Sequence, residues 1–413
     1  MRNNLHEDNR MKTRIVLPTL LLLLLLPLSV LVPPPMRLDA ADAAHGVASP
    51  RAGVQGRPAA QAATERSIRL AYFIPQDRRP AADHERKIRL IMSSVAELYV
   101  GDLRAAGCDT DGPQFEGEPG QALVHVVRGA RDAAYYNNRP RYDADEQWRR
   151  LLPEVRAQLG EPRRRVTVVF AETYDEIGPA EHLWPGSVAR GAYLGADGGL
   201  AVFSAHLLRD GLGATTRAGL LKLLDDDTPV LGRRAWGHGM NSPRRAFVED
   251  GIGAVAHELG HALGLPHDRR DDARDLMGNG FRNVRRNFGV GTGPRVAFSA
   301  ENRLLLMSSR YLAKDLSPTD ATPPQVDLAA ARDGRGVWSV AVKARDDAGL
   351  RAIVFVDRGA GTVVAGRKLS GREAEFRQRL PGGAAAGDLD LQVIVTDEGG
   401  HQTRQAIKAA RGG

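Results

Sequence analysis

The segment best suited to carry chemistry is HELGHALGLPH, which runs from His257 to His267. His257 and His261 are four residues apart, so on a helix their rings project from nearly the same face, one turn apart. Two imidazoles held in this way supply two of the ligands that a tetrahedral zinc ion needs. Glu258 is offset around the helix, where it can reach a water molecule on the metal rather than the metal itself. The spacing therefore predicts a catalytic zinc site.

The third ligand is expected from the segment that follows this helix. Gly264 can adopt a left-handed conformation at no steric cost, and Pro266 opposes continuation of the helix. The chain then turns back and brings His267 towards the first two histidines. The helix itself is predicted to bury one apolar stripe, made of Val248, Ile252, Val255, Leu259 and Leu263.

The pattern H-E-x-x-H-x-x-G-x-x-H resembles that of the metzincins, zinc endopeptidases that also carry a methionine turn. The resemblance covers roughly residues 66–315. It implies that one Zn²⁺ is bound by His257, His261 and His267. It also implies that Glu258 is the general base for a metal-activated water that hydrolyses peptide bonds, and that Met277 lies under the zinc as a hydrophobic floor.

The subfamily stays open. Asp268, directly after the third histidine, resembles the adamalysin type, whereas HELGHALGL resembles the matrixins equally well. Asn279 stands where astacins and serralysins carry a tyrosine ligand, so no tyrosine switch is expected. Cys108 is the only cysteine and lies inside the ordered part of the chain. A propeptide cysteine switch and an internal disulfide are therefore not expected.

The family resemblance also suggests how a substrate binds. An extended peptide is expected to pair by β-augmentation with an edge strand just before the active-site helix. This predicted edge strand consists of Leu200, Ala201, Val202, Phe203 and Ser204.

His206, His238 and the run Asp225–Asp227 could hold a second, structural ion, because imidazoles and carboxylates suit zinc and calcium. Their spacing matches no known binding loop. Surface positions are therefore the favoured interpretation, and a structural calcium has no support from the sequence.

Between residues 66 and 206, segments with the apolar pattern of strands alternate with segments with the apolar pattern of helices. Strands are predicted at 68–74, 122–127, 165–170 and 199–204, and helices at 84–106 and 143–159, followed later by the active-site helix and a closing helix near 298–307. This order predicts an α/β (α+β) domain over residues 66–315, with a mixed, mostly parallel sheet.

The last ninety residues have a different pattern. After a proline-rich linker near Pro323, short alternating runs separated by turns predict an all-β sandwich over residues 320–413 that resembles immunoglobulin-like modules. We expect it to fold independently and to bind a ligand that the sequence does not identify. The catalytic unit is expected to bind zinc and to cleave peptides without it.

The N-terminus predicts export. Basic residues precede an apolar run from Ile15 to Val32, and the small-residue string Ala41-Asp42-Ala43 follows. Residues 1–43 are thus expected to be a signal peptide cleaved near Ala43, with an uncleaved anchor as the alternative, and residues 44–65 a flexible lead-in. The mature protein is expected to be secreted or extracytoplasmic, with no stable membrane insertion.

The formal charge of +7 does not indicate a nucleic-acid partner, because the basic residues are dispersed among acidic ones and no recognition motif is present. The predicted partner is a protein or peptide substrate. Two alternatives stay open: a secreted surface-binding or adhesion protein with a zinc fold and little turnover, and a zinc hydrolase of non-peptide amides. The presence of Glu258 argues against the surface-binding alternative, since a zinc site that only binds needs no base.

Overall fold

A computed structural model describes residues 66–176, 184–195, 198–380 and 388–410. The expected signal peptide, 1–43, and lead-in, 44–65, lie outside these ranges. Among the helices in the described ranges, none combines the length and the apolar character required to cross a bilayer.

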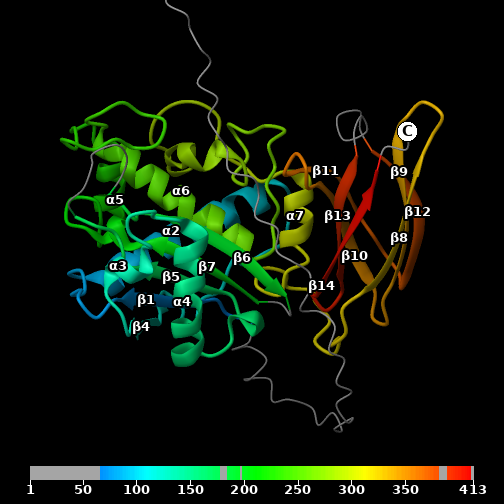
Figure 1. The fold of residues 1–413 in the computed structure, drawn as a ribbon, viewed down its shortest axis with the longest axis horizontal. Coiled ribbons are helices and arrows are strands. Elements are labelled where there is room, and N and C mark those ends of the chain that lie inside the picture. Colours follow the sequence, from blue (N-terminus) through cyan, green and yellow to red (C-terminus); the bar gives the residue numbers. More distant parts are fainter. Residues whose placement is uncertain (1–65, 177–183, 196–197, 381–387, 411–413) are drawn as a thin grey trace, which may run out of the picture. The chain divides into compact units, whose positions relative to one another are not determined.

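The first part of the chain is built on a five-stranded sheet (Figure 1). Its order is β4 (Val124–Arg128), β1 (Arg69–Ile74), β5 (Thr167–Ala171), β7 (Gly198–Ser204) and β6 (Ala189–Gly195). The first four strands run parallel, and β6 pairs antiparallel with β7 at the edge. The predicted mixed, mostly parallel sheet is confirmed, but β6 was not predicted. Its sequence, ARGAYLG, carries two glycines and no apolar alternation, which is why the pattern gave no strand signal.

The three inner strands, β1, β5 and β7, are buried on both faces of the sheet, as their uninterrupted apolar sequences require. In β1, Leu70 and Tyr72 face one core cluster and Ala71 and Phe73 face another. The second cluster is closed by helix α4 (Ala144–Leu159) through residues such as Leu151. The first is closed by α2 (His84–Ala105) and α6 (Arg244–Ala262). The domain is therefore a three-layer α/β structure.

The remaining elements of this part are short. They are the helices α3 (Ala133–Tyr136), α5 (Arg217–Leu224) and α7 (Ala300–Leu306), the 3₁₀ segments η2 (Pro162–Arg164), η3 (Ala205–Leu208) and η4 (Asn279–Phe288), and the hairpin β2 (Gly117–Glu118) and β3 (Gln121–Ala122). Helix α7 is the predicted closing helix, capped by the Ser299 side chain.

Helix α6 approaches the sheet unusually closely because two glycines lie beneath it. A Cβ atom at Gly191 would be 2.1 Å from the backbone oxygen of Glu258, and one at Gly199 would be 2.1 Å from that of Ala262. Any larger residue at either position would push the helix away. These two strand glycines therefore set the distance between the sheet and the helix that carries the histidines.

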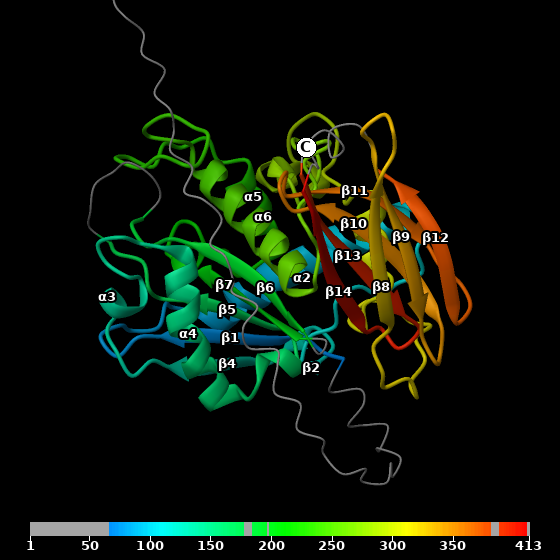
Figure 2. The ribbon, with the colours of Figure 1, turned by 45° about the vertical axis from the view of Figure 1, so that its right-hand side comes forward.

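The C-terminal part consists of two antiparallel sheets (Figure 2). One contains β11 (Thr362–Lys368), β10 (Leu350–Asp357), β13 (Leu389–Asp397) and β14 (Gln402–Ala409), and the other β12 (Glu373–Arg379), β9 (Trp338–Arg345) and β8 (Gln325–Arg332). Val340 and Val342 of the second sheet share a core cluster with Ile353 and Phe355 of the first. The predicted sandwich is thus confirmed as an architecture, and its immunoglobulin-like relationship stays a prediction.

The two inner strands of the four-stranded sheet, β10 and β13, are buried on both faces. Residues that alternate with those of the sandwich core, namely Val354, Val356, Val363 and Ile394, belong to the same apolar cluster as α2 and α6. In the preceding part, Leu305 and Leu306 of α7 belong to that cluster too. The two parts of the chain therefore share one hydrophobic core, which a sequence reading of two separate domains does not anticipate.

Candidate metal centre

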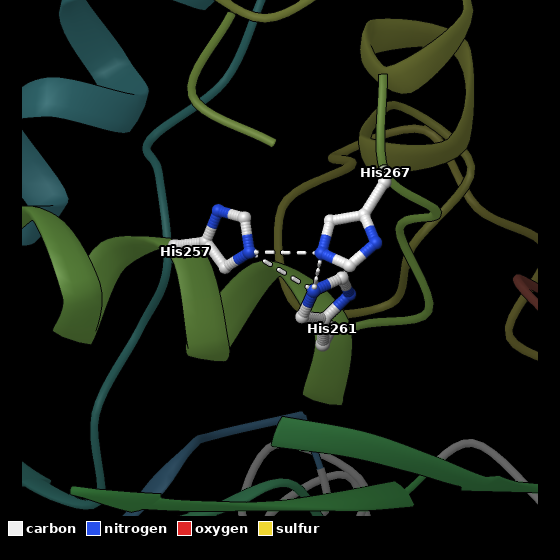
Figure 3. Close-up of side chains that lie close together, drawn as sticks. All are labelled: His257, His261 and His267. Atoms are coloured by element: carbon white, nitrogen blue, oxygen red, sulfur yellow. Dashed lines mark hydrogen bonds between the residues drawn. The ribbon is translucent and has the colours of Figure 1, made fainter. Parts of the chain in front are cut away.

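The three histidines of the motif converge on one point (Figure 3). His257 and His261 project from α6, and His267 from the loop after it. Their Nε2 atoms are 3.1 Å apart for His257–His261, 3.3 Å for His257–His267 and 3.0 Å for His261–His267. Zinc–nitrogen bonds of 2.0–2.1 Å in a tetrahedron place ligand nitrogens about 3.3–3.4 Å apart. The triangle is close to the size that a tetrahedral zinc requires.

The orientation of two rings is fixed from behind by backbone carbonyls. His257 Nδ1 lies 2.7 Å from the oxygen of Leu276, and His261 Nδ1 lies 2.9 Å from that of Leu265. A carbonyl only accepts, so each Nδ1 carries the hydrogen and each Nε2 presents a lone pair. Lone pairs facing one another at 3.1 Å repel unless a cation lies between them. The donor set therefore fits a bound metal ion, with the carbonyls acting as its supporting shell.

Burial also keeps the imidazoles neutral. It lowers the pKa of His257 and that of His267 to about 4, and the pKa of His261 falls well below its usual value. Metal binding requires a neutral imidazole, so the histidines need no deprotonation at pH 7.

Glu258 lies on the side of α6 that faces the edge strand. The backbone N–H of Gly191 donates to its Oε2 at 2.5 Å. Burial raises the pKa of this carboxyl to about 7, against the opposing effect of the Gly191 hydrogen bond and the charge of Arg190. The predicted base is thus a half-buried carboxyl on the helix that carries His257 and His261, and it is not a member of the ligand group.

The supporting residues lie around the triangle. Gly264 has a φ of 95° and ends the helix as expected. Met277 is fully buried, and a Cβ at Gly260 would meet its Sδ at 2.5 Å, so its side chain packs against α6 at Gly260. Asp268 is 1% exposed and pairs with Arg270 at 2.6 Å. Its backbone N–H donates to the Met277 carbonyl, which joins the two loops.

The predicted substrate strand needs a correction. Residues Leu200 to Ser204 belong to β7, which is buried between β5 and β6 and has no free edge. The prediction that they form the edge strand was therefore wrong. The edge is β6, and its Gly191 contacts Glu258 directly. The error arose because β6 carries no strand pattern in its sequence.

The alternative ion site also does not form. His206 is 3% exposed and stacks on Trp184, so its interpretation as a surface residue was wrong. Asp226 and Asp227 instead pair with Arg244 and Arg245 at the start of α6. Within the described ranges, His206 and these aspartates belong to no group with metal-ligand spacing.

The C-terminal part reaches the metal centre, which sequence analysis missed. The Val363 N–H donates to the His267 carbonyl at 3.1 Å, and the Arg269 N–H donates to Thr362 Oγ1 at 2.8 Å. On β14, Arg404 donates to the carbonyl of Gly264 and its guanidinium lies 4.5 Å from the Tyr193 ring. These contacts join residues far apart in the sequence and depend on how the two parts pack, for which a single sequence carries no signal.

Solved structures of a bacterial enzyme, one of them in complex with a substrate, have a fold similar to that of this chain. That enzyme is OgpA from Akkermansia muciniphila. Catalytically inactive OgpA in complex with an O-glycopeptide (glycodrosocin) substrate matches with a TM-score of 0.56 and 16% identity, over 84% of this chain and 93% of that chain. Wild-type OgpA matches with a TM-score of 0.55 and 18% identity over the same shares. At these identities the likeness establishes the fold. No family model and no curated protein matches the chain.

Proposed function

We propose that this protein is a zinc-dependent endopeptidase. The observation that carries the proposal is the convergence of His257, His261 and His267, with the half-buried carboxyl of Glu258 on the same helix as the first two. Three neutral nitrogen ligands leave one position open on a tetrahedral ion, which is typical of catalytic and not of structural zinc sites. The fold that the chain shares with OgpA, an enzyme seen with a peptide substrate, supports the same conclusion.

The chain's own residues divide the work as follows. The three histidines hold a zinc ion, which lowers the pKa of water and polarises the scissile carbonyl when it is bound. Glu258 Oε2 is engaged by the Gly191 N–H, so Oε1 is the oxygen that takes a proton from the attacking water and returns it to the leaving amine. Among the described strands, β6 pairs only with β7, so its other edge can pair with an extended peptide.

We also propose that the substrate is an O-glycosylated peptide or protein, because OgpA has been captured with an O-glycopeptide. The comparison to make is the cleavage of an O-glycosylated peptide against that of the same peptide without its glycan. Cleavage of the first alone supports this substrate class. Equal cleavage of both overturns the glycan requirement but leaves the peptidase intact.

The general-base role is tested by Glu258→Gln. We expect peptide cleavage to fall by at least about 10³-fold while one equivalent of zinc stays bound. The matched control is Glu249→Gln, which changes a buried carboxyl of α6 that pairs with Arg285 and does not join the histidine group. Full activity in Glu258→Gln, or absence of zinc from the unchanged protein after incubation with the metal, would refute the proposal.

The proposed setting of this activity is outside the cytoplasm, on the strength of the leader-like N-terminus, whose residues lie outside those described. Sequencing the N-terminus of the exported protein tests it. A new terminus near Ala44 supports cleavage and release, whereas retention of the apolar run supports the anchored alternative.

A further inference from the structure

A second group of metal-ligating side chains lies in the C-terminal part, away from the histidine triangle. It brings together three segments: the linker at Asp320, the β9–β10 turn at Asp346 and Asp347, and the end of β13 at Asp397. Ligand oxygens of Asp320, Asp346 and Asp347 lie within 4.8 Å of one another, and so do ligand atoms of Asp320, Asp397 and His401. Asp320 is common to both sets.

Three of these aspartates share one arrangement, in which Oδ1 is used by the backbone and Oδ2 is not. Asp346 Oδ1 accepts from the N–H groups of the turn that follows it, at 2.9 and 2.8 Å. Asp397 Oδ1 accepts at 2.9 and 2.8 Å in the same way, and Asp320 Oδ1 accepts at 3.1 Å from Thr322. In each of the three, Oδ2 is buried and accepts no hydrogen bond from the described residues, although Asp397 Oδ2 lies 3.3 Å from His401 Nδ1.

Burial makes the position of these carboxylate oxygens energetically unfavourable. Asp397 is 0% exposed and Asp346 is 9% exposed, so their unsatisfied oxygens lie inside the protein. A buried carboxylate oxygen without a partner is strongly unfavourable unless a cation compensates it. Asp320 is packed against the β13–β14 turn, since a Cβ at Gly399 would lie 2.7 Å from its Oδ2. Burial is the main cause that raises the pKa of Asp320, and the charges of Asp397 and Asp346 raise it further.

The histidine of this group lies between Asp397 and Arg310. His401 Nδ1 lies 3.3 Å from Asp397 Oδ2, and its Nε2 lies 3.2 Å from a guanidinium nitrogen of Arg310. A guanidinium only donates, so Nε2 is the acceptor and the ring hydrogen is on Nδ1, on the side of Asp397. Arg372 lines an open hollow of about 500 Å³ next to Asp320 and Asp347, through which solvent reaches the group.

We propose that Asp320, Asp346, Asp347 and Asp397 form a calcium site. The ligands are hard carboxylate oxygens drawn from three separate segments, which matches the six to eight oxygens and adaptable geometry that Ca²⁺ accepts. Mg²⁺ demands a tight octahedron and keeps its waters, and zinc prefers nitrogen and sulfur ligands. A bound ion ties the linker to both turns, next to the contact between the Ser317 N–H and the Glu398 carbonyl.

The experiment uses the full chain, stripped on a chelating resin and given one equivalent of zinc. Calcium alone is then titrated by calorimetry and thermal unfolding. We expect one equivalent to bind with a dissociation constant of about 10⁻⁴–10⁻³ M or tighter, as in extracellular modules, and to raise the Tm by about 5 °C at saturation. Magnesium at the same concentration should raise the Tm by less than half as much.

The variants are Asp320→Asn and Asp346→Asn, with Asp333→Asn as the matched control. Asp333 also caps a turn of the same part, but it pairs with Arg379 and joins no cluster. Without calcium, the two site variants should be at least as stable as the unchanged protein, because a repelling charge has gone. With calcium they should lose the rise in Tm, whereas Asp333→Asn keeps it.

Three results overturn the proposal. The first is that the unchanged protein binds no calcium at about 10 mM, a hundredfold above the tighter expected dissociation constant. The second is that Asp333→Asn loses calcium binding as much as the site variants do. The third is that a second equivalent of zinc binds and is removed by His401→Gln, while calcium has no effect. Should a site variant not fold, the titration of the unchanged protein decides alone: one equivalent of calcium supports the site, and none overturns it.

Discussion

The backbone N–H of Val363 donates a hydrogen bond to the carbonyl oxygen of His267, the third histidine of the metal centre, at 3.1 Å. The donor belongs to β11 of the C-terminal part and the acceptor to the loop after α6. Together with the core that both parts share, this contact changes what we expect of the isolated catalytic unit.

A chain that ends after Lys314 should therefore lose zinc affinity. The sequence alone led us to expect that such a chain folds and binds zinc normally. Truncation removes the partner of His267 and uncovers the apolar residues that Val354 and Val356 bury. Loss of supporting contacts typically costs about 10–100-fold in metal affinity. Competition with a chromogenic chelator measures it. A folded, truncated protein with unchanged zinc affinity would restore the expectation of two independent domains.

Arg404→Met should destabilise the protein by about 1–3 kcal/mol, because it leaves the Gly264 carbonyl without its donor while preserving most of the side-chain volume. It also removes the cation from the Tyr193 ring. Urea unfolding monitored by fluorescence gives the change. Arg377→Met, at an exposed position of β12, removes the same charge as a control. Equal effects of the two variants would mean that net charge, and not the contact at the helix end, is responsible.

Gly191→Ala should reduce both stability and catalysis. The added methyl group would lie 2.1 Å from the Glu258 backbone oxygen, so α6 must move away from the sheet. Forced overpacking of this kind costs about 1–3 kcal/mol, and it displaces the base and the two helical histidines together. Gly101→Ala is the control, since a Cβ there meets nothing within 4 Å and its helix gains propensity. Peptide cleavage and thermal unfolding are measured for both. Normal activity in Gly191→Ala would show that the helix position is not critical.

Glu116→Gln should change the pH dependence of stability. Although burial raises the pKa of Glu116, hydrogen bonds from Arg69 and His125 and the charges of Arg69 and Arg165 lower it to about 2 in the folded protein. The ordinary value is 4.5, so the folded state favours the ionised form, and the stabilisation is present above about pH 4.5 and lost as the pH falls towards 2.

The variant should thus be less stable at pH 7, by about 1–2 kcal/mol once solvent screening is allowed for. The difference should shrink between about pH 5 and pH 2. Chemical unfolding at a series of pH values measures it. Glu118→Gln, on an exposed strand of the same hairpin, is the control. A deficit independent of pH would point to lost packing and not to lost charge.

The features that could be predicted from the sequence are those that regular periodicity and residue spacing encode. The strand at Arg69–Ile74, the helix at Ala144–Leu159 and the turn at Gly264 lie close to where the pattern predicts them, because apolar alternation and a left-handed glycine have direct local causes. The histidine group could be predicted for the same reason, since residues four apart on a helix must share a face.

What the sequence did not predict depends on long-range pairing. Strand β6 is defined by its partner β7 and not by its own residues, so the edge was assigned one strand too early. The carbonyls of Leu276 and Leu265 orient the ligands with backbone atoms, which every residue type possesses. The double-sided burial of β10 follows from packing between parts that the sequence presents as separate.

The hydrogen bond between Arg269 and Thr362 joins residues that are 93 positions apart, and Arg269 is the second residue after His267. A ribosome makes the chain from its N-terminus, so the motif emerges long before the strand that holds its loop in place. The contacts from β11 to the loop with His267 can form only once β11 has been synthesised. The order of synthesis thus delays these supports of the metal centre until most of the polypeptide exists.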